Sequence, residues 1–139
     1  MTGGATSDRG GRWALWVVED EPASARLVAE LCRAAGGDAS VFPAPTPFLA
    51  ALRHGSPPRA VVLDWRLGHE VSAALFLATR HRHPGLPVIY WTATDARNLP
   101  AMIREDGFTI IVDKAGGAAS LERALAWAVT ERRVDWASD

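Results

Sequence analysis

Lysine is nearly absent from this chain of 139 residues, in which fourteen of the fifteen basic residues are arginines and the one lysine is Lys114. Lysine and arginine are not interchangeable at a tight anion site. The ammonium is a compact point charge on a flexible stem, whereas the guanidinium is a planar fork. Lys114 stands at the end of the largely apolar run Phe108-Thr-Ile-Ile-Val-Asp-Lys and is therefore a candidate functional residue.

Cysteine, net charge and long apolar runs are also scarce. The single cysteine, Cys32, excludes an internal disulfide framework and fits a reducing cytoplasm. A formal net charge of −1 lacks the excess of positive charge that is typical of nucleic-acid-binding proteins. No apolar run approaches the roughly 20 residues of a membrane span, and the polar N-terminus lacks the apolar core of a signal peptide. We therefore expect a cytoplasmic protein that binds neither nucleic acid nor membrane.

The length and composition predict one globular domain, because 48% of the residues are hydrophobic and 22% are charged. We expect a flexible N-terminal tail at residues 1–11, the folded domain at 12–132 and a loose C-terminal tail at 133–139.

Strand-like and helix-like segments alternate along the domain, which is typical of a parallel sheet built from βα repeats. The expected strands are at about 13–19, 39–42, 60–64, 87–92 and 108–113. The expected helices are at about 22–35, 46–54, 70–82, 100–106 and 120–132. Five strands and five helices favour a flavodoxin-like, doubly wound α/β fold with strand order 2-1-3-4-5.

Four of the five expected strands end in polar side chains. Glu19 and Asp20 close the first strand, Asp64 the third, Thr92 the fourth and Lys114 the fifth. Ligands of doubly wound sheets bind outside the carboxyl ends of the strands, and the first and third strands are neighbours in this order. We therefore expect these side chains to converge on one site.

Three converging carboxylates would repel one another unless a cation neutralised them. Magnesium is the natural partner, because it takes one or two carboxylates, several waters and a phosphate oxygen. Lys114 and Thr92 add an ammonium and a hydroxyl that suit a phosphoryl group. A carboxylate can itself be the nucleophile and form an aspartyl phosphate.

Four motifs together resemble the receiver domain of bacterial two-component response regulators. They are Val17-Val18-Glu19-Asp20-Glu21-Pro22, Val61-Val62-Leu63-Asp64, Pro87-Val88-Ile89-Tyr90-Trp91-Thr92-Ala93 and Lys114. The resemblance covers about residues 12–132. It implies that Asp64 accepts a phosphoryl group from a sensor histidine kinase or a phosphotransfer protein.

The resemblance also implies a role for the neighbouring residues. Asp20, Asp64 and the backbone carbonyl of Arg66 would bind Mg²⁺, and Glu19 would act largely through a bound water.

Around the phosphoryl group, the resemblance implies that Thr92 is the switch hydroxyl and that Lys114 pairs with the phosphoryl oxygens. The backbone N–H groups of Trp65 and Ala93 would point at the same oxygens.

The sequence departs from the family's pattern at four places. Glu19 stands where an aspartate is usual, and Ile111 stands where a rotating aromatic switch is usual. Ala115 replaces the proline that normally follows Lys114 through a cis bond, so we predict a trans bond and a shifted loop. Residues 68–72 replace the usual loop after the phosphoacceptor.

Three functions compete for this pattern. The first is a single-domain receiver that acts as a regulatory phosphoacceptor rather than an enzyme and signals through an unknown downstream protein. The second is a pseudo-receiver that binds a protein independently of phosphorylation, which the residues at 19, 111 and 115 favour. The third is an enzyme on a similar sheet, such as a haloacid-dehalogenase-like phosphatase or a nucleotide-binding protein. The first strand lacks the D-x-D pattern of that phosphatase class, and no phosphate-binding glycine loop follows it.

The face of the last helix is a candidate homodimer surface.

Overall fold

The order of strands and helices follows the alternation in the sequence. The computed structural model describes residues 7–8 and 11–137, with side chains described for residues 11–130. The strands are β1 (Ser7–Asp8), β2 (Arg12–Val18), β3 (Gly37–Phe42), β4 (Ala60–Leu63), β5 (Arg66–Leu67), β6 (Glu70–Val71), β7 (Val88–Thr92) and β8 (Thr109–Asp113). The helices are α1 (Pro22–Ala34), α2 (Pro45–Arg53), α3 (Ala73–Arg82), α4 (Ala101–Arg104) and α5 (Gly117–Ala137), with short 3₁₀ helices η2 (Ala96–Asn98) and η3 (Lys114–Gly116).

Five parallel strands form the central sheet in the order β3-β2-β4-β7-β8. This order confirms the expected 2-1-3-4-5 topology, with the neighbouring first and third strands represented by β2 and β4. The four residues of β4 are all buried, as a continuous apolar strand in the middle of a parallel sheet requires. β1 adds a short antiparallel pairing to β2, which the sequence did not predict.

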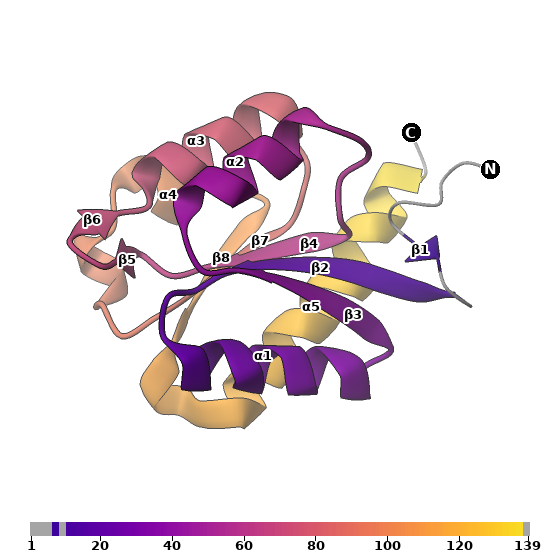
Figure 1. Ribbon diagram of the computed structural model, residues 1–139, viewed down its shortest axis with the longest axis horizontal. Coiled ribbons are helices and arrows are strands. Elements are labelled where there is room, and N and C mark those ends of the chain that lie inside the picture. The colour runs from indigo at the N-terminus through magenta and orange to yellow at the C-terminus, as the bar shows by residue number, and fades with distance from the viewer. Residues whose placement is uncertain (1–6, 9–10, 138–139) are drawn as a thin grey trace.

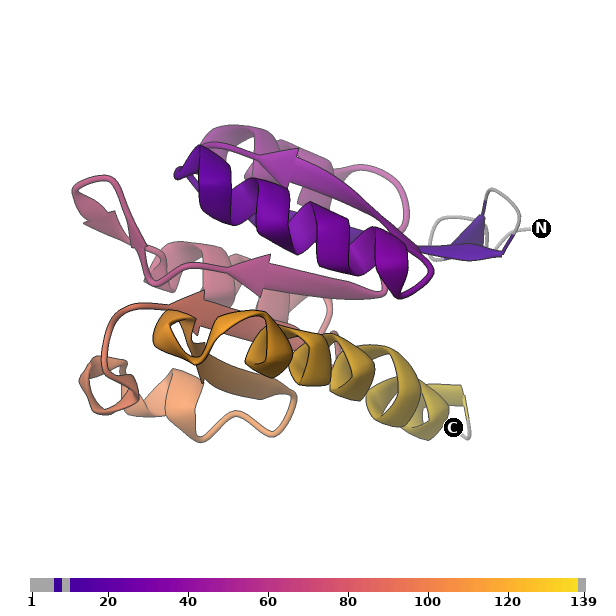
Figure 2. The same ribbon diagram turned by 90° about the horizontal axis from the view of Figure 1, so that it is seen from below.

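Helices cover both faces of the sheet. α2, α3 and α4 lie on one face, and α1 and α5 lie side by side on the other (Figures 1 and 2). Each face has its own core cluster, one around Phe48 and Tyr90 and the other around Leu15 and Leu125. Full burial of such side chains contributes about 1.5–3 kcal/mol each. None of the helices within residues 11–137 combines the length and apolar character that crossing a bilayer would need.

The loop after β4 differs from the expected structure. We expected a helix to begin near Glu70, but residues 66–71 form the antiparallel β5–β6 hairpin and α3 begins at Ala73. Gly68 has a φ of +64° at the turn of the hairpin, a conformation that side chains rarely adopt. The hairpin projects beside the carboxyl ends of the strands (Figure 1).

The two ends of the domain also differ from the expected boundaries. α5 continues to Ala137, so residues 133–137 are helical where we expected a loose tail. Residues 118–139 contain no glycine or proline, and alanine, glutamate and arginine favour a helix. In the expected N-terminal tail, Ser7 and Asp8 pair with β2, while residues 1–6 and 9–10 lie outside the described residues.

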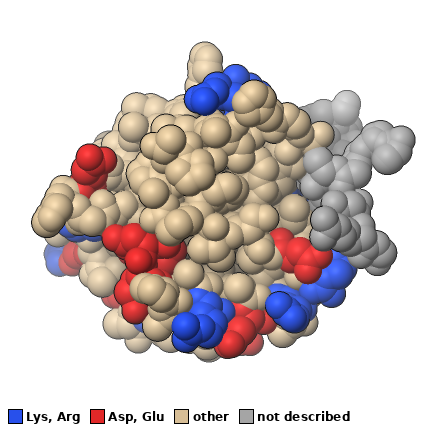
Figure 3. Space-filling model, viewed as in Figure 1, with Lys and Arg blue, Asp and Glu red and all other residues tan. Residues whose placement is uncertain are grey.

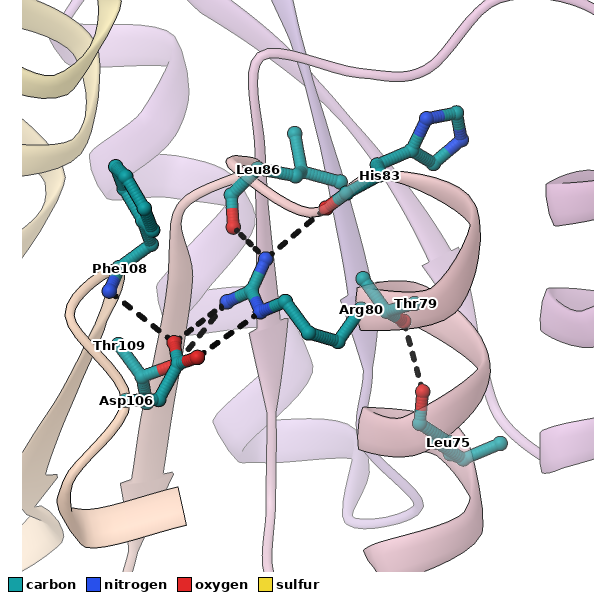
Figure 4. A network of polar contacts seen from close by, with 8 residues as sticks. All are labelled: Leu75, Thr79, Arg80, His83, Leu86, Asp106, Phe108 and Thr109. Carbon is teal, nitrogen blue, oxygen red and sulfur yellow. Dashed lines mark hydrogen bonds and ion pairs between the residues drawn. The ribbon is translucent and has the colours of Figure 1, made fainter. Parts of the chain in front are cut away.

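A partly buried polar network fixes α3 to the segment before β8 (Figure 4). Arg80 makes a bidentate contact with Asp106, at 3.2 Å from Nε to Oδ1 and 2.8 Å from the terminal nitrogen to Oδ2. Its remaining N–H groups donate to the carbonyls of His83 and Leu86 and to the hydroxyl of Thr109. This network lies away from the strand ends that carry the candidate site.

Candidate functional site

The register of the sheet brings four strand ends together. Val18 of β2 pairs with Leu63 of β4, and Leu63 pairs with Tyr90 of β7. The residues that follow these strands therefore leave the sheet at the same edge. Because all five strands are parallel, the residue after β8, Lys114, arrives there as well. Figure 3 shows acidic side chains at the left of the molecule, on the side where Figure 1 places β5 and β6.

Lys114 joins two of the three predicted carboxylates. Its Nζ lies 2.9 Å from Oδ2 of Asp64 and 3.0 Å from Oε1 of Glu19. Glu19 and Asp64 are buried, with 3% and 8% of their surface exposed, and the Lys114 side chain is 20% exposed. The sole lysine of the chain therefore bridges the ends of β2 and β4 from the end of β8. This contact confirms that three of the predicted residues converge.

The bridge contains two carboxylates and one ammonium. Burial raises the pKa of Glu19, and Asp64 raises it further, against the opposing effect of Lys114. Burial works to lower the pKa of Lys114, but the hydrogen bonds and charges of Asp64 and Glu19 outweigh burial and raise it. The ammonium therefore stays protonated at neutral pH, and the cluster sets two acidic groups against one basic group.

Asp20 lies apart from this bridge. Its side chain is exposed, and Oδ2 accepts a hydrogen bond of 2.8 Å from the backbone N–H of Gly68 in the β5–β6 hairpin. No group of three or more histidine, cysteine, aspartate or glutamate side chains is arranged for a metal within the described residues. In the structure Lys114 contacts Glu19 and Asp64 while Gly68 contacts Asp20, each through a single carboxylate oxygen, and the convergence of the three acids on one metal stays a prediction.

The donor chemistry at this edge nevertheless fits magnesium. Mg²⁺ uses one or two carboxylates and keeps several waters, so it does not require a cage of three acids. Asp20 and Asp64 supply carboxylate oxygens, and Arg66 supplies a backbone carbonyl two residues after Asp64. The backbone N–H of Arg66 donates a long hydrogen bond of 3.4 Å to Oδ1 of Asp64.

Thr92 ends β7 in a buried position, with 1% of its surface exposed. Its Oγ1 accepts a hydrogen bond of 3.1 Å from the N–H of Thr94, and the hydroxyl keeps its own hydrogen to donate. Ala93 follows Thr92, is exposed, and lines a hollow together with Asp95 and Ile111. Thr92 and Ala93 thus lie at the carboxyl end of β7, and their roles at a phosphoryl group stay a prediction.

Trp65 follows Asp64 and turns its side chain into the core. The ring is 8% exposed and makes an edge contact with Tyr90, at 6.2 Å between centroids. The Tyr90 hydroxyl in turn accepts a hydrogen bond of 3.2 Å from Ser72, the residue before α3. Burial raises the pKa of Tyr90, so the hydroxyl is neutral.

Two contacts of the site were not predicted from the sequence. One is the hydrogen bond from Gly68 to Asp20, which depends on the unexpected hairpin. The other is the contact of Lys114 with Trp91, whose ring centroid lies 5.1 Å from Nζ. In the sequence, Trp91 directly precedes Thr92 and so indicates an aromatic ring near the site, but the sequence does not show that this ring faces Lys114.

The peptide bond after Lys114 is trans, as predicted, since the described residues contain no cis peptide bond. The chain then turns through η3, where Oδ1 of Asp113 accepts a hydrogen bond of 2.8 Å from the N–H of Ala115.

Comparison with known proteins identifies the fold. No protein-family model matches the sequence, and no curated protein matches it either. Among solved structures, a response regulator receiver protein from Sinorhizobium medicae superposes with a TM-score of 0.74 at 18% identity, over 87% of this chain and 97% of that one. The N-terminal domain of a response regulator/sensory box/GGDEF protein from Carboxydothermus hydrogenoformans gives a TM-score of 0.73 at 20% identity, over 90% and 98%.

A third similar structure is the receiver domain of a sensor histidine kinase from Pseudomonas aeruginosa. It gives a TM-score of 0.69 at 18% identity, over 86% of this chain and 98% of that one, and it was solved with a magnesium ion coordinated in its active site cleft. At these identities the comparison shows the fold, which is that of response regulator receiver domains.

Proposed function

We propose that this chain is a response regulator receiver in which Asp64 accepts a phosphoryl group in the presence of Mg²⁺. One observation carries the proposal. Asp64 directly follows the central strand β4, and its Oδ2 lies 2.9 Å from Nζ of Lys114, the only lysine in the chain. A buried acid next to an ammonium, with a threonine hydroxyl ending the adjacent strand, is a set of groups that suits phosphoryl transfer. The receiver fold of the similar structures supports this function.

In the proposed reaction, an oxygen of Asp64 attacks the phosphorus of a phosphohistidine on the donor protein. The new P–O bond forms as the P–N bond breaks, and the electron pair of the broken bond stays on the imidazole. Lys114 neutralises the incoming phosphoryl oxygens, and the Thr92 hydroxyl donates to one of them. The backbone N–H groups of Trp65 and Ala93 would donate to the other oxygens.

A magnesium ion held by Asp20, Asp64 and the carbonyl of Arg66 would supply charge neutralisation for the phosphoryl group. Glu19 would contact it largely through water. Glu19 also gives Lys114 a second carboxylate, at 3.0 Å, before any phosphoryl group arrives.

We assign residues 12–132 to the receiver domain and propose that it acts in the cytoplasm as a regulatory phosphoacceptor rather than as an enzyme. The buried and unpaired Cys32 is consistent with a reducing compartment. The phosphodonor would be a sensor histidine kinase or a phosphotransfer protein, and the output a changed interaction with a downstream protein or a second copy of the chain. Neither nucleic acid nor membrane is needed for this role.

The test is the intact mass of the protein after incubation with acetyl phosphate and Mg²⁺. We expect a gain of one phosphoryl group in the wild type and none in Asp64→Asn, because an amide is not a competent acceptor. Glu122→Gln, which changes an exposed acid on α5, is the matched control and should be labelled as the wild type is. Labelling that persists in Asp64→Asn would place the acceptor elsewhere.

One specific observation favours the second candidate, a pseudo-receiver that works without phosphorylation. Glu19 and Asp64 already share Lys114, and Asp20 is already bonded to Gly68, so the acids have partners without a metal. A short-lived aspartyl phosphate would escape the mass measurement, so beryllofluoride with Mg²⁺ is the second probe, read by tryptophan fluorescence. No mass gain and no fluorescence change would favour the pseudo-receiver and direct the search to partners of the unmodified protein.

A further inference from the structure

Lys114 has a third contact besides its two carboxylates. Its Nζ lies over the ring of Trp91, at 5.1 Å from the centroid, on the strand that ends with Thr92. A cation within about 6 Å of an aromatic face is attracted by the negative charge of that face, and tryptophan gives the strongest attraction. Trp91 is 3% exposed, so this attraction is weakly screened by water.

The chemistry of Trp91 suggests that its role goes beyond filling the core. Its Nε1 is buried and makes no hydrogen bond with any of the described residues. An unsatisfied buried donor is unfavourable, and phenylalanine would fill much of the same space without one. The contact that gives this tryptophan a role beyond packing is then the one that its π face makes with the Lys114 ammonium.

The three contacts approach the ammonium from different elements. Glu19 follows β2, Asp64 follows β4, and Trp91 belongs to β7. Lysine has a flexible stem, and two carboxylates alone would let the ammonium move between them. A fixed ring beside both carboxylates limits where the ammonium can lie.

We infer that Trp91 is a positioning residue that holds the Lys114 ammonium at Asp64 through a cation–π contact. Its consequence for phosphoryl transfer rests on the proposed function, because a fixed ammonium would meet the phosphoryl oxygens without first having to be reoriented. Trp91 itself does not touch the reacting atoms.

The contact can be measured without any phosphodonor. Because the chain has one lysine, protein labelled with ¹³C,¹⁵N-lysine gives a single lysine spin system by NMR, that of Lys114. The indole ring should shift its ε-methylene protons upfield from the position of a free lysine. Trp91→Leu should remove most of that shift, and Trp91→Phe should keep part of it.

A matched control separates this contact from core packing. Trp13→Leu removes another buried tryptophan from the same core cluster, at the opposite end of the sheet, and should leave the Lys114 signals unchanged. Lys114 signals that are the same in the wild type, Trp91→Leu and Trp91→Phe would overturn the inference.

The rate of phosphorylation by acetyl phosphate then tests the consequence. We expect Trp91→Leu to slow labelling of Asp64 by about threefold to thirtyfold and Trp91→Phe by about twofold, the range that a partly to largely desolvated cation–π contact corresponds to. Trp13→Leu should label at the wild-type rate. An unchanged rate in Trp91→Leu, with the wild type being labelled, would show that the contact does not position Lys114 for transfer.

The two proposals fail in distinguishable ways. If the wild type shows the upfield shift but is never labelled, the contact stands and the phosphoacceptor function fails. If the wild type is labelled but the shift is absent, the phosphoacceptor function stands and the role of Trp91 fails.

Discussion

Among residues 11–130, one partly buried and one largely buried cluster of charged side chains differ in how completely their members are satisfied. In the cluster between α3 and β8, Arg80 and Asp106 balance each other as one cation and one anion. At the carboxyl ends of the strands, Lys114 is shared by Glu19 and Asp64. The shortest ion-pair distances are almost the same, 2.8 Å and 2.9 Å, so distance alone does not tell a structural pair from a reactive one.

The Arg80 cluster is complete. The guanidinium has an acceptor for each of its five N–H groups, and Oδ2 of Asp106 also accepts from the N–H of Phe108 and the hydroxyl of Thr109. The guanidinium additionally lies 5.4 Å from the ring centroid of Phe76. A partly buried pair whose donors are all used is best explained as a structural connection.

The Lys114 cluster is incomplete by comparison, because one ammonium faces two carboxylates and the exposed Asp20 follows Glu19 in sequence. A site that binds a cation needs more acidic than basic groups. Such an imbalance lowers the free energy of unfolding, because the like groups repel one another. An unbalanced cluster of acids and bases is therefore a stronger sign of function than a short ion pair.

The largest expected effect on stability is at the balanced cluster. Asp106→Ala would leave the Arg80 guanidinium mostly buried without its anion, and we expect a loss of about 3 kcal/mol in the free energy of unfolding. Urea unfolding measures this change. The control is Asp95→Ala, which breaks the Asp95–Arg97 pair at 2.7 Å on the surface and should change the unfolding midpoint far less. Equal effects of the two variants would mean that the Arg80 network is no more structural than a surface pair.

A smaller effect is expected at Cys32, a buried titratable group that is kept neutral instead of being paired. Burial raises the pKa of its thiol from the ordinary value of 9.0 to about 12. Above pH 9 the unfolded chain loses this proton while the folded chain keeps it, so stability falls as the pH rises from about 9 to 12.

Between pH 7 and 10.5, the wild type should therefore lose about 2 kcal/mol more stability than Cys32→Ala. Urea unfolding of both proteins at the two pH values gives the difference, and other groups that titrate in this range cancel in the comparison. Equal losses in the two proteins would mean that the thiol ionises as easily in the fold as in the unfolded chain.

The sequence predicted the sheet and the ends of its strands because both depend on local pattern. An apolar run such as that of β4 is buried on both faces, and the polar residue that closes it must lie at the edge. The strand order then brings Glu19, Asp64 and Lys114 together whatever the side-chain conformations are.

What the sequence did not predict depends on conformation at single residues. Asp20 turns to the N–H of Gly68 only because residues 66–71 fold as a hairpin, and this short segment has no periodicity that distinguishes a hairpin from a helix start. The contact of Lys114 with Trp91 depends on the rotamers of both side chains, which sequence patterns do not specify. The end of α5 was placed too early because a polar segment was interpreted as a tail, although its residues favour a helix.

The smallest expected effect is a gain in stability at the unbalanced cluster. Asp64→Asn removes one of the two carboxylates while Lys114 keeps its contact with Glu19, at 3.0 Å. The repulsion between Glu19 and Asp64 disappears, and the amide oxygen can still accept a hydrogen bond from the ammonium.

We expect Asp64→Asn to be more stable than the wild type by about 1 kcal/mol at pH 7, although it has lost its phosphoacceptor. Urea unfolding checks the sign, with the exposed Glu122→Gln as the control for removing one negative charge. A loss of stability as large as that of Asp106→Ala would mean that Asp64 is as structural as Asp106 and would remove the contrast between the clusters. A gain would mean that this fold retains an unfavourable buried charge at Asp64, and the chemistry of that carboxylate is the explanation that the surrounding groups support.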